Sequence, residues 1–234
     1  MSRKNDGSVF RPTHLFCYDK DLSCFTKYGT EILLTKAQSL LPPNGIPRFC
    51  YYIKNGRIIK YGSTVLDEEV IYDCYGTGAL LFELEAPLQQ NMKTAYKALK
   101  DSVLIQIPRE VIFKEIGENP ESLDTFMQYL ATVRHHNFRQ ARESWLQCVE
   151  WRICKFLLTY AYRYGAEYDG KILITEKISQ ETIAKMLCIS RVSVVRSIRT
   201  LRDMGLIEQI NGHYCIRSEN QLERHMQTID NLLY

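Results

Sequence analysis

The sequence predicts an α+β protein with a β-rich N-terminal domain, a long connecting helix and a smaller C-terminal domain. Three stretches with different hydrophobic periods support this prediction. Short aromatic and β-branched runs fill about residues 15–107, and a run of more than 25 residues without Gly or Pro follows. Beyond it, two short helical patterns precede a pair of short strands, so the chain changes class from β to α along its length.

Length and composition favour a globular protein of ordinary type. The chain has 234 residues, of which 45% are hydrophobic and 24% charged, enough to bury one large core or two modest ones. No apolar run approaches the roughly 20 residues that span a bilayer. The N-terminus, "MSRKNDGSVFRPTH", has a basic start without the apolar stretch of a signal peptide. We therefore expect a cytoplasmic protein without a membrane partner.

The cysteines and the net charge narrow the function further. The eight cysteines include no CxxC pair, so we expect free thiols that fill small buried sites, and no metal ligands or required cofactor. A metal or iron–sulfur site that uses Cys17 and Cys24 remains the alternative. The net charge is only +3, so binding to nucleic acid would depend on local charge.

The N-terminal strands read as a barrel or roll. "RFCYYIKNGRIIKYGS" has β-type runs on both sides of Asn55-Gly56, which is a strong signal for a hairpin turn. "EEVIYDCYGTGALLFE" and "DSVLIQIP" continue the series of short strands, with turns near Gly62 and Gly76. No segment repeats closely enough to indicate a propeller or a solenoid. An all-β barrel or roll is the expected architecture.

A long helix is predicted from about residue 120 to 146. Pro120 suits a first helical turn. Apolar or small residues recur at alternating spacings of four and three, as in a seam between two helices: Phe126, Leu130, Val133, Asn137 and Ala141. We interpret this as a dimerisation helix, and the alternative is a helix packed on its own β domain. His135 and His136 are expected to be solvated rather than to bind haem.

The C-terminal region has the order of elements of a winged helix-turn-helix. "CVEWRICKFLLTYAYRYG" is an amphipathic helix that ends at Gly165. "ISQETIAKML" and "RVSVVRSIRTLRDM" are two helices separated by the three residues 188–190. "GLIEQINGHYCI" then has two apolar runs around an Asn-Gly turn. Two helices on a short turn, followed by a hairpin, indicate the winged arrangement.

The second of these two helices has one apolar face and one face of unusual composition. Val194, Ile198 and Leu201 fall on one side, while Val192, Arg196 and Arg199 lie roughly opposite. A helix fits the DNA major groove, where arginine can bond guanine and valine can meet a thymine methyl group. Residues 178–204 hold five Lys/Arg against two Asp/Glu, and the alternative interpretation is a solvated charged face.

Each residue at this surface has an expected role. Arg196 should contact bases, Val192 should contact a thymine methyl group, and Arg191, at the helix end, suits either bases or phosphates. Phosphates should be held by serines at the helix starts and by one arginine. The complete set of predicted DNA contacts is Ser179, Ser190, Arg191, Val192, Ser193, Arg196 and Arg199.

At "ISQETIAKMLCISRVSVVRSIRTLRDMGLI" the chain resembles the DNA-binding module of the cyclic-AMP receptor/fumarate-nitrate regulator (Crp/Fnr) family of bacterial transcription factors. Ser-Arg followed by Ser-Val-x-Arg is the specific part. Upstream, "YIKNGRI" is similar to the family's glycine-containing β-roll hairpin, "YGTGALLFEL" to the segment before its effector pocket, and "GENPE" to the start of its dimer helix. The resemblance covers nearly the whole chain.

The resemblance implies a fold, a set of domains and partners. The N-terminal domain should be a double-stranded β-helix, which is a cupin-like β-roll that binds an effector. The expected parts are a tail at 1–14, the β-roll at 15–118, a dimerisation helix and hinge at 119–147, and the winged helix-turn-helix at 148–234. Double-stranded DNA, a second copy of the chain and RNA polymerase are the implied partners.

The sequence also departs from the family pattern. Val192 stands where the family has glutamate. Glutamate can accept a hydrogen bond from cytosine and valine cannot, so a thymine contact is expected at this position and the inverted-repeat site should be A/T-rich. Cyclic-nucleotide-binding members have Gly-Glu-Leu at Phe82-Glu83-Leu84 and Arg-Ser-Ala at Lys93-Thr94-Ala95. A lysine does not replace the arginine fork that holds a phosphate.

Asn91 and Tyr129 are more similar to a branch of anaerobe regulators that sense small, halogenated aromatic acids. We therefore expect a small anionic effector, with Lys93 opposite a carboxylate and aromatic side chains against a ring. The expected effector contacts are Phe82, Glu83, Asn91, Lys93, Thr94 and Tyr129.

Several alternatives stay open. Within the family these are a cyclic-nucleotide sensor and a regulator that responds through an iron–sulfur cluster, a haem or a thiol, although the N-terminus lacks a cysteine cluster. A β domain that serves only as an interaction scaffold is a further possibility. An enzyme is the alternative from another class. Against it, the sequence has no glycine-rich nucleotide loop, HExxH or GxSxG.

Overall fold

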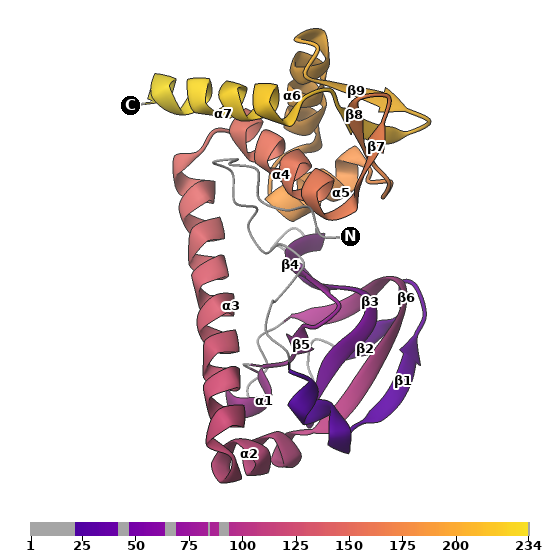
Figure 1. Ribbon diagram of the computed structural model, residues 1–234, viewed down its shortest axis with the longest axis vertical. Coiled ribbons are helices and arrows are strands. Elements are labelled where there is room, and N and C mark those ends of the chain that lie inside the picture. Colours follow the sequence, from indigo (N-terminus) through magenta and orange to yellow (C-terminus); the bar gives the residue numbers. More distant parts are fainter. Residues whose placement is uncertain (1–21, 42–46, 64–68, 84, 89–93, 234) are drawn as a thin grey trace. The chain divides into compact units, whose positions relative to one another are not determined.

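The computed structural model describes residues 22–41, 47–63, 69–83, 85–88 and 94–233, and every statement below refers to these. They form two compact units, one within residues 14–139 and the other within 140–234, and the division falls inside the long helix. An antiparallel β-rich unit, a long helix and a helix-turn-helix unit follow in that order (Figure 1), which confirms the predicted α+β class.

The N-terminal unit is built on one antiparallel sheet. Its strand order is β1-β6-β3-β4, with β2 also paired to β6 and β5 to β3. A 3₁₀ helix, η1, precedes the strands, and three helices accompany or follow them. The elements are η1 (Ser23–Tyr28), β1 (Thr30–Leu34), β2 (Ser39–Leu41), β3 (Phe49–Ser63), β4 (Glu69–Gly76), β5 (Leu80–Leu81), α1 (Glu85–Leu88), β6 (Ala95–Pro108), α2 (Arg109–Glu118) and α3 (Pro120–Leu146).

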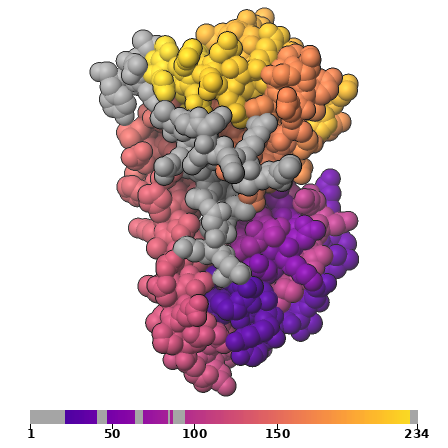
Figure 2. Space-filling model, in the orientation of Figure 1, coloured from indigo at the N-terminus to yellow at the C-terminus, as the bar shows by residue number. Residues whose placement is uncertain are grey.

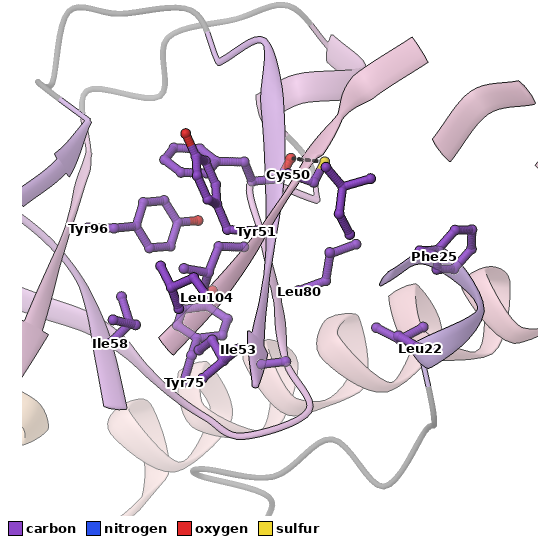
Figure 3. Close-up of a cluster of buried hydrophobic side chains, with 14 of the residues drawn as sticks. Leu22, Phe25, Cys50, Tyr51, Ile53, Ile58, Tyr75, Leu80, Tyr96 and Leu104 are labelled. Atoms are coloured by element: carbon purple, nitrogen blue, oxygen red, sulfur yellow. Dashed lines mark hydrogen bonds between the residues drawn. The ribbon is translucent and has the colours of Figure 1, made fainter. Parts of the chain in front are cut away.

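The core of this unit is a single cluster of aliphatic and aromatic side chains (Figure 3). Ile53 and Ile58 of β3 and Leu104 of β6 are buried in it. The Phe82 ring packs against those of Tyr51 and Tyr96, and the ring centroids of Phe82 and Tyr96 are 4.3 Å apart. Burial of such rings removes a large apolar area from water, so this cluster supplies much of the stability of the unit.

Asn55 and Gly56 do not form the predicted hairpin turn. Strand β3 runs through them without reversing, and its register against β6 shifts on both sides of Asn55. Gly56 has φ of +136°, and a Cβ atom there would lie 2.1 Å from Ser102 Oγ. The glycine is therefore required by a bulge and a close strand approach, which the same dipeptide signals as readily as a turn.

Helix α3 has two apolar faces, and the first three residues of the predicted seam, Phe126, Leu130 and Val133, pack within their own unit. Phe126 and Val133 are buried against the β-rich unit of their own chain, so the alternative interpretation holds for this face. His136 is also buried there, which corrects the expectation that it is solvated. A second stripe, rotated around the helix, is exposed and contains Leu123, Met127, Phe138 and Trp145, the last 79% exposed.

The C-terminal unit combines helices with a sheet of order β7-β8-β10-β9. Helix α6 packs on α4 and α5, and α7 packs on α4. The elements are α4 (Val149–Tyr164), β7 (Gly165–Tyr168), β8 (Lys171–Ile174), α5 (Gln180–Leu187), α6 (Arg191–Asp203), β9 (Ile207–Ile210), β10 (His213–Ile216) and α7 (Glu219–Leu233). The helices predicted at 148–165, 178–187 and 191–204 are confirmed.

Sequence reasoning missed the β7–β8 hairpin and helix α7. The hairpin turns at Asp169-Gly170, which have φ of +51° and +69°, as a two-residue turn of type I′ requires. Asp-Gly is a recognised signal for such a turn. Helix α7 buries Leu222 and Met226, and its His225 Nε2 lies 2.7 Å from Glu150 Oε1 of α4.

We predict that Leu104→Ala lowers the free energy of unfolding of the N-terminal unit by about 2–5 kcal/mol, because the substitution leaves a cavity beside fully buried rings. The control is Leu33→Ala on neighbouring β1, where the side chain is exposed and the change should cost little. Urea unfolding of both variants measures the difference. Equal losses would contradict the assignment of the core.

Candidate nucleic-acid interface and ligand site

Helices α5 and α6 each begin at a serine cap. Ser179 Oγ accepts a hydrogen bond from Thr182 N–H at 3.0 Å, and Ser190 Oγ accepts one from Ser193 N–H at 3.0 Å. Cys188, which ends α5, has φ of +50° in the left-handed region, and this conformation reverses the chain between the helices. Arg152 of α4 donates a hydrogen bond to the carbonyl of Leu187 beside this turn. The turn is thus held by the backbone conformation of Cys188 and by the hydrogen bond from Arg152.

The buried face of α6 sets the direction of its outer face. Val194, Ile198 and Leu201 are buried, as predicted from their spacing. Val192, on the opposite side, is 67% exposed, and Arg196 and Arg199 are exposed beside it. The Val192 side chain is largely in water, on the same face as Arg196 and Arg199, and so contributes little to packing within the chain. The arrangement suits contact with another molecule.

Most of the predicted DNA contacts lie at the start and along the exposed face of α6. Ser190, Arg191 and Ser193 lie in the cap and first turn of α6, and Ser179 caps α5. The hydroxyl groups of Ser190 and Ser193 also form a hydrogen bond with each other, with their Oγ atoms 2.8 Å apart. Arg199 pairs with Asp203 at 3.7 Å, but both side chains are exposed, so this ion pair is weak.

Two further candidates emerge from the structure. Val195 is exposed next to Arg196, and a helical wheel drawn over the whole helix would have identified it. Lys177 could not be found from sequence, because only the folded hairpin brings it to the turn between β9 and β10. A carbon added at Gly212 of that turn would lie 3.9 Å from Lys177 Nζ.

The wing formed by β9 and β10 is braced at its base. Asn211 and Gly212 have φ of +51° and +83°, so the predicted Asn-Gly turn is confirmed here. Glu208 of β9 lies 2.8 Å from Lys171 Nζ of β8 and 3.2 Å from Arg217. The ion pair with Lys171 connects the wing to the β7–β8 hairpin, and the one with Arg217 closes the base of the wing itself.

The predicted effector residues lie in the buried part of the N-terminal unit, where the structure describes them. Phe82 has φ of +63°, a conformation that costs a non-glycine residue roughly 1–2 kcal/mol. Its ring packs against those of Tyr51 and Tyr96. Phe82 therefore adopts a backbone conformation that suits glycine, the residue of the cyclic-nucleotide-binding members at this position, although its own side chain is bulky. Asn91 and Lys93 lie outside the described residues.

Two buried carboxyl groups follow Phe82. Glu85 pairs with Lys60 and accepts a hydrogen bond from the Tyr96 hydroxyl at 3.4 Å. Glu83 is 1% exposed, and its Oε2, like Thr94 Oγ1, has no hydrogen-bond partner among the described residues. Burial raises the pKa of Glu83 to about 8, although Lys60 lowers it. At neutral pH Glu83 is thus protonated and able to donate a hydrogen bond.

Tyr129 is the member of the predicted ligand set that comes from α3. Its side chain is fully buried, and its hydroxyl accepts a hydrogen bond from the Leu80 N–H and donates one to the Leu80 C=O. Leu80 lies two residues before Phe82. The structure therefore connects Tyr129 to the segment of Phe82 and Glu83 through the backbone.

Metal-binding clusters and membrane-spanning helices are both absent from the described part of the chain. Within the described part of the chain, no group of three or more His, Cys, Asp or Glu is placed to hold a metal ion. The free thiols include buried Cys50, Cys74, Cys154 and Cys215 and exposed Cys188, while Cys17 lies outside the described residues. No helix in the same part of the chain is long and apolar enough to cross a membrane.

Comparison with known proteins identifies the C-terminal unit and the fold. Residues 152–225 match a Crp-like helix-turn-helix domain. A CRP-like cAMP-activated global transcriptional regulator of Mycobacterium tuberculosis is 23% identical over 120 residues, which are 51% of this chain and 54% of the relative. The match thus spans about half the length of that curated relative.

Solved structures of similar fold cover most of the chain. A mutant of CooA from Carboxydothermus hydrogenoformans has a TM-score of 0.74 at 18% identity, over 91% of this chain and 98% of CooA. A CprK variant complexed with OCPA has a TM-score of 0.68 at 15% identity, over 87% of this chain and 92% of CprK. These similarities show that the β-rich domain, long helix and helix-turn-helix form a known two-unit fold.

We predict that Glu83→Gln changes the pH dependence of stability. Between pH 4.5 and about 8 the unfolded chain has released this proton and the folded chain keeps it. The free energy of unfolding of the wild type should therefore fall, relative to Glu83→Gln, by about 1.4 kcal/mol per pH unit as the pH rises through this window. Urea unfolding at pH 5.5 and 7.5 measures it, with exposed Glu118→Gln as the control. Parallel profiles for wild type and Glu83→Gln would refute the assignment.

Proposed function

We propose that this chain, whose residues 152–225 match a Crp-like helix-turn-helix domain, is a regulator of the Crp/Fnr type that controls transcription by binding DNA in response to a small molecule. The observation that carries the proposal is the outer face of α6. It presents Val192, Arg196 and Arg199 to solvent from a helix whose other face is fully buried. DNA, RNA polymerase and the cytoplasm are the partners and the place that this function implies.

The residues of α5 and α6 divide into two roles on DNA. Arg196 contacts a base edge, and Val192 contacts a thymine methyl group, so the site is A/T-rich. Ser179, Ser190 and Arg199 hold phosphates, while Arg191 and Ser193 serve either role at the helix start. Two nearby groups extend the surface, because Val195 is exposed beside Arg196 and Lys177 stands at the wing turn.

The second face of α3 supports a homodimer. Leu123, Met127, Phe138 and Trp145 are exposed large apolar side chains on one stripe. In the space-filling view, side chains of α3 reach the surface along the helix (Figure 2). A second copy of the same helix would cover this stripe symmetrically. Two DNA-binding units in a two-fold dimer then require an inverted-repeat site.

The effector that we propose is a small anionic aromatic acid. CprK, which shares the fold, was solved in complex with OCPA. Protonated Glu83 can donate a hydrogen bond to an oxyanion, and Lys93 and Asn91 supply a charge and an amide. Thr94 Oγ1 adds a buried hydroxyl. Phe82 and Tyr129 form the apolar side of the site.

A cyclic nucleotide is the second candidate effector. The Mycobacterium tuberculosis relative is described as cAMP-activated, and Glu83 could accept a ribose hydroxyl when ionised. Against this candidate, the bulky Phe82 ring, packed on Tyr51 and Tyr96, stands where the cyclic-nucleotide-binding members have glycine. We therefore favour the smaller acid.

We predict that Arg196→Ala and Arg199→Ala weaken DNA binding in different ways. Arg196→Ala should cost about 1–3 kcal/mol and remove the preference at one base pair of each half-site. Arg199→Ala should weaken binding to all sequences alike and reduce the salt slope by about 0.9 for each phosphate that the protein no longer neutralises. Val192→Glu should shift preference from thymine toward cytosine. A titration against a randomised inverted-repeat library at two salt concentrations separates these effects. A uniform loss for both arginine variants would leave α6 as a plain basic face.

We predict that Met127→Asp raises the dimer dissociation constant at least about tenfold, because burial of an unpaired carboxylate at the interface costs several kcal/mol. His135→Asp is the control, since His135 lies on the polar side of α3 and is exposed. Analytical ultracentrifugation across a dilution series measures both variants. A wild type that stays monomeric at high concentration would exclude the dimer.

A further inference from the structure

The outer face of helix α6 is made of two residue types. Within α6, which the structure describes in full, the exposed side chains that precede Asp203 are all arginine or valine: Arg191, Val192, Val195, Arg196, Arg199 and Arg202. Each valine is followed four residues later by an arginine, which places Arg196 beside Val192. The same spacing places Arg199 beside Val195. These four residues, the valine–arginine stripe, share one face of the helix, where the valines are 67% and 43% exposed.

The stripe offers N–H donors and methyl groups to a partner. An arginine side chain donates hydrogen bonds and does not accept them. The two partly exposed hydroxyl groups of α6 are already bonded within the chain, since Ser193 bonds in the helix cap and Thr200 Oγ1 donates to the Arg196 carbonyl at 3.2 Å. The carboxylate of Asp203 lies in the last turn and pairs with Arg199. The first turns of α6 therefore present no carboxylate or amide oxygen.

Such a stripe fits some base edges of the major groove better than others. Guanine presents two acceptors there, and thymine presents one acceptor and a C5-methyl group, whereas cytosine presents an amino group that needs an acceptor. A valine contacts the methyl group and forms no hydrogen bond with the rest of the base edge. A cytosine that carries a methyl group at C5 therefore offers a valine the same apolar contact as thymine does.

We propose that the valine–arginine stripe recognises C5-methyl groups of DNA, so that methylation of a cytosine opposite Val192 or Val195 strengthens binding. This inference rests on the proposed function, because it concerns the DNA site that α6 binds. A 5-methylcytosine followed by guanine presents its methyl group to Val192 and the guanine acceptors to Arg196. The methylation state of the DNA is then a second input to this regulator, beside its small-molecule effector.

Binding of the full-length wild-type protein to modified duplexes tests the proposal. The inverted repeat selected from the randomised library is synthesised with thymine, deoxyuridine, cytosine or 5-methylcytosine at each pyrimidine position of the half-site in turn. Thymine differs from deoxyuridine, and 5-methylcytosine from cytosine, by one methyl group. In fluorescence-anisotropy titrations, the methyl group should strengthen binding about fourfold in both comparisons at the positions that the valines contact, as burial of one methyl group does.

Two variants identify the side chains that contact the methyl groups. Because Val192 and Val195 are exposed, Val192→Ala and Val195→Ala leave the core of the unit unchanged. Each variant should lose the methyl effect at its own position and keep it at the other. Met204→Ala is the matched control, since Met204 is also apolar and 56% exposed but lies beyond the last residue of α6. This variant should keep both methyl effects.

Equal affinity for cytosine and 5-methylcytosine at every position of the half-site would overturn the proposal, whatever the result with deoxyuridine. A methyl effect that both valine variants keep would also overturn it. In both cases the selected duplex is still bound specifically, so the proposed function stands. Failure of the proposed function gives a different result, in which the wild type binds the selected duplex no more tightly than an unrelated one, and both ideas then fall.

Discussion

A helix that buries one face fixes what its other face presents, and both of the surfaces to which we assign a function depend on that constraint. In α6 the burial of Val194, Ile198 and Leu201 leaves Val192 and Arg196 in solvent. In α3 the burial of Phe126, Tyr129 and Val133 leaves a second apolar stripe uncovered. The apolar core therefore does more than stabilise each unit, because it also orients the residues that we propose contact DNA and a second copy.

The proposed ligand site has an interior in which a bulky aromatic side chain occupies a conformation that suits glycine. A phenylalanine occupies a backbone conformation that glycine adopts without strain, and its ring packs on Tyr96. The neighbouring carboxyl group of Glu83 is buried deeply enough to hold its proton at neutral pH. Glu83 thus offers a hydrogen-bond donor in place of an ionised carboxylate, and Phe82 offers an aromatic ring in place of the open space that a glycine would leave. The chemistry of the site therefore follows from packing as much as from residue identity.

Much of the fold and of the DNA-binding surface could be predicted from the sequence, because the signals there are local. Ser179 and Ser190 are caps, and the stripe of Val194, Ile198 and Leu201 has a clear helical period. The errors arose where the deciding contact is distant in sequence. Gly56 is needed for a close approach to Ser102, and the side of α3 that is buried depends on the surface of the sheet beneath it. Nor could a single sequence show that His136 meets Asp73, or that Lys177 stands beside Gly212.

The hairpin of β7 and β8 gives the wing a property that a free hairpin lacks. The turn at Asn211 and Gly212 is one end of a four-stranded sheet, and Glu208 ties β9 to Lys171 of β8. A surface that is already ordered loses little conformational entropy when a partner binds. In the proposed complex with DNA, the wing would therefore bind as a preformed hairpin, and its share of the affinity would be set by its contacts and not reduced by the cost of ordering it.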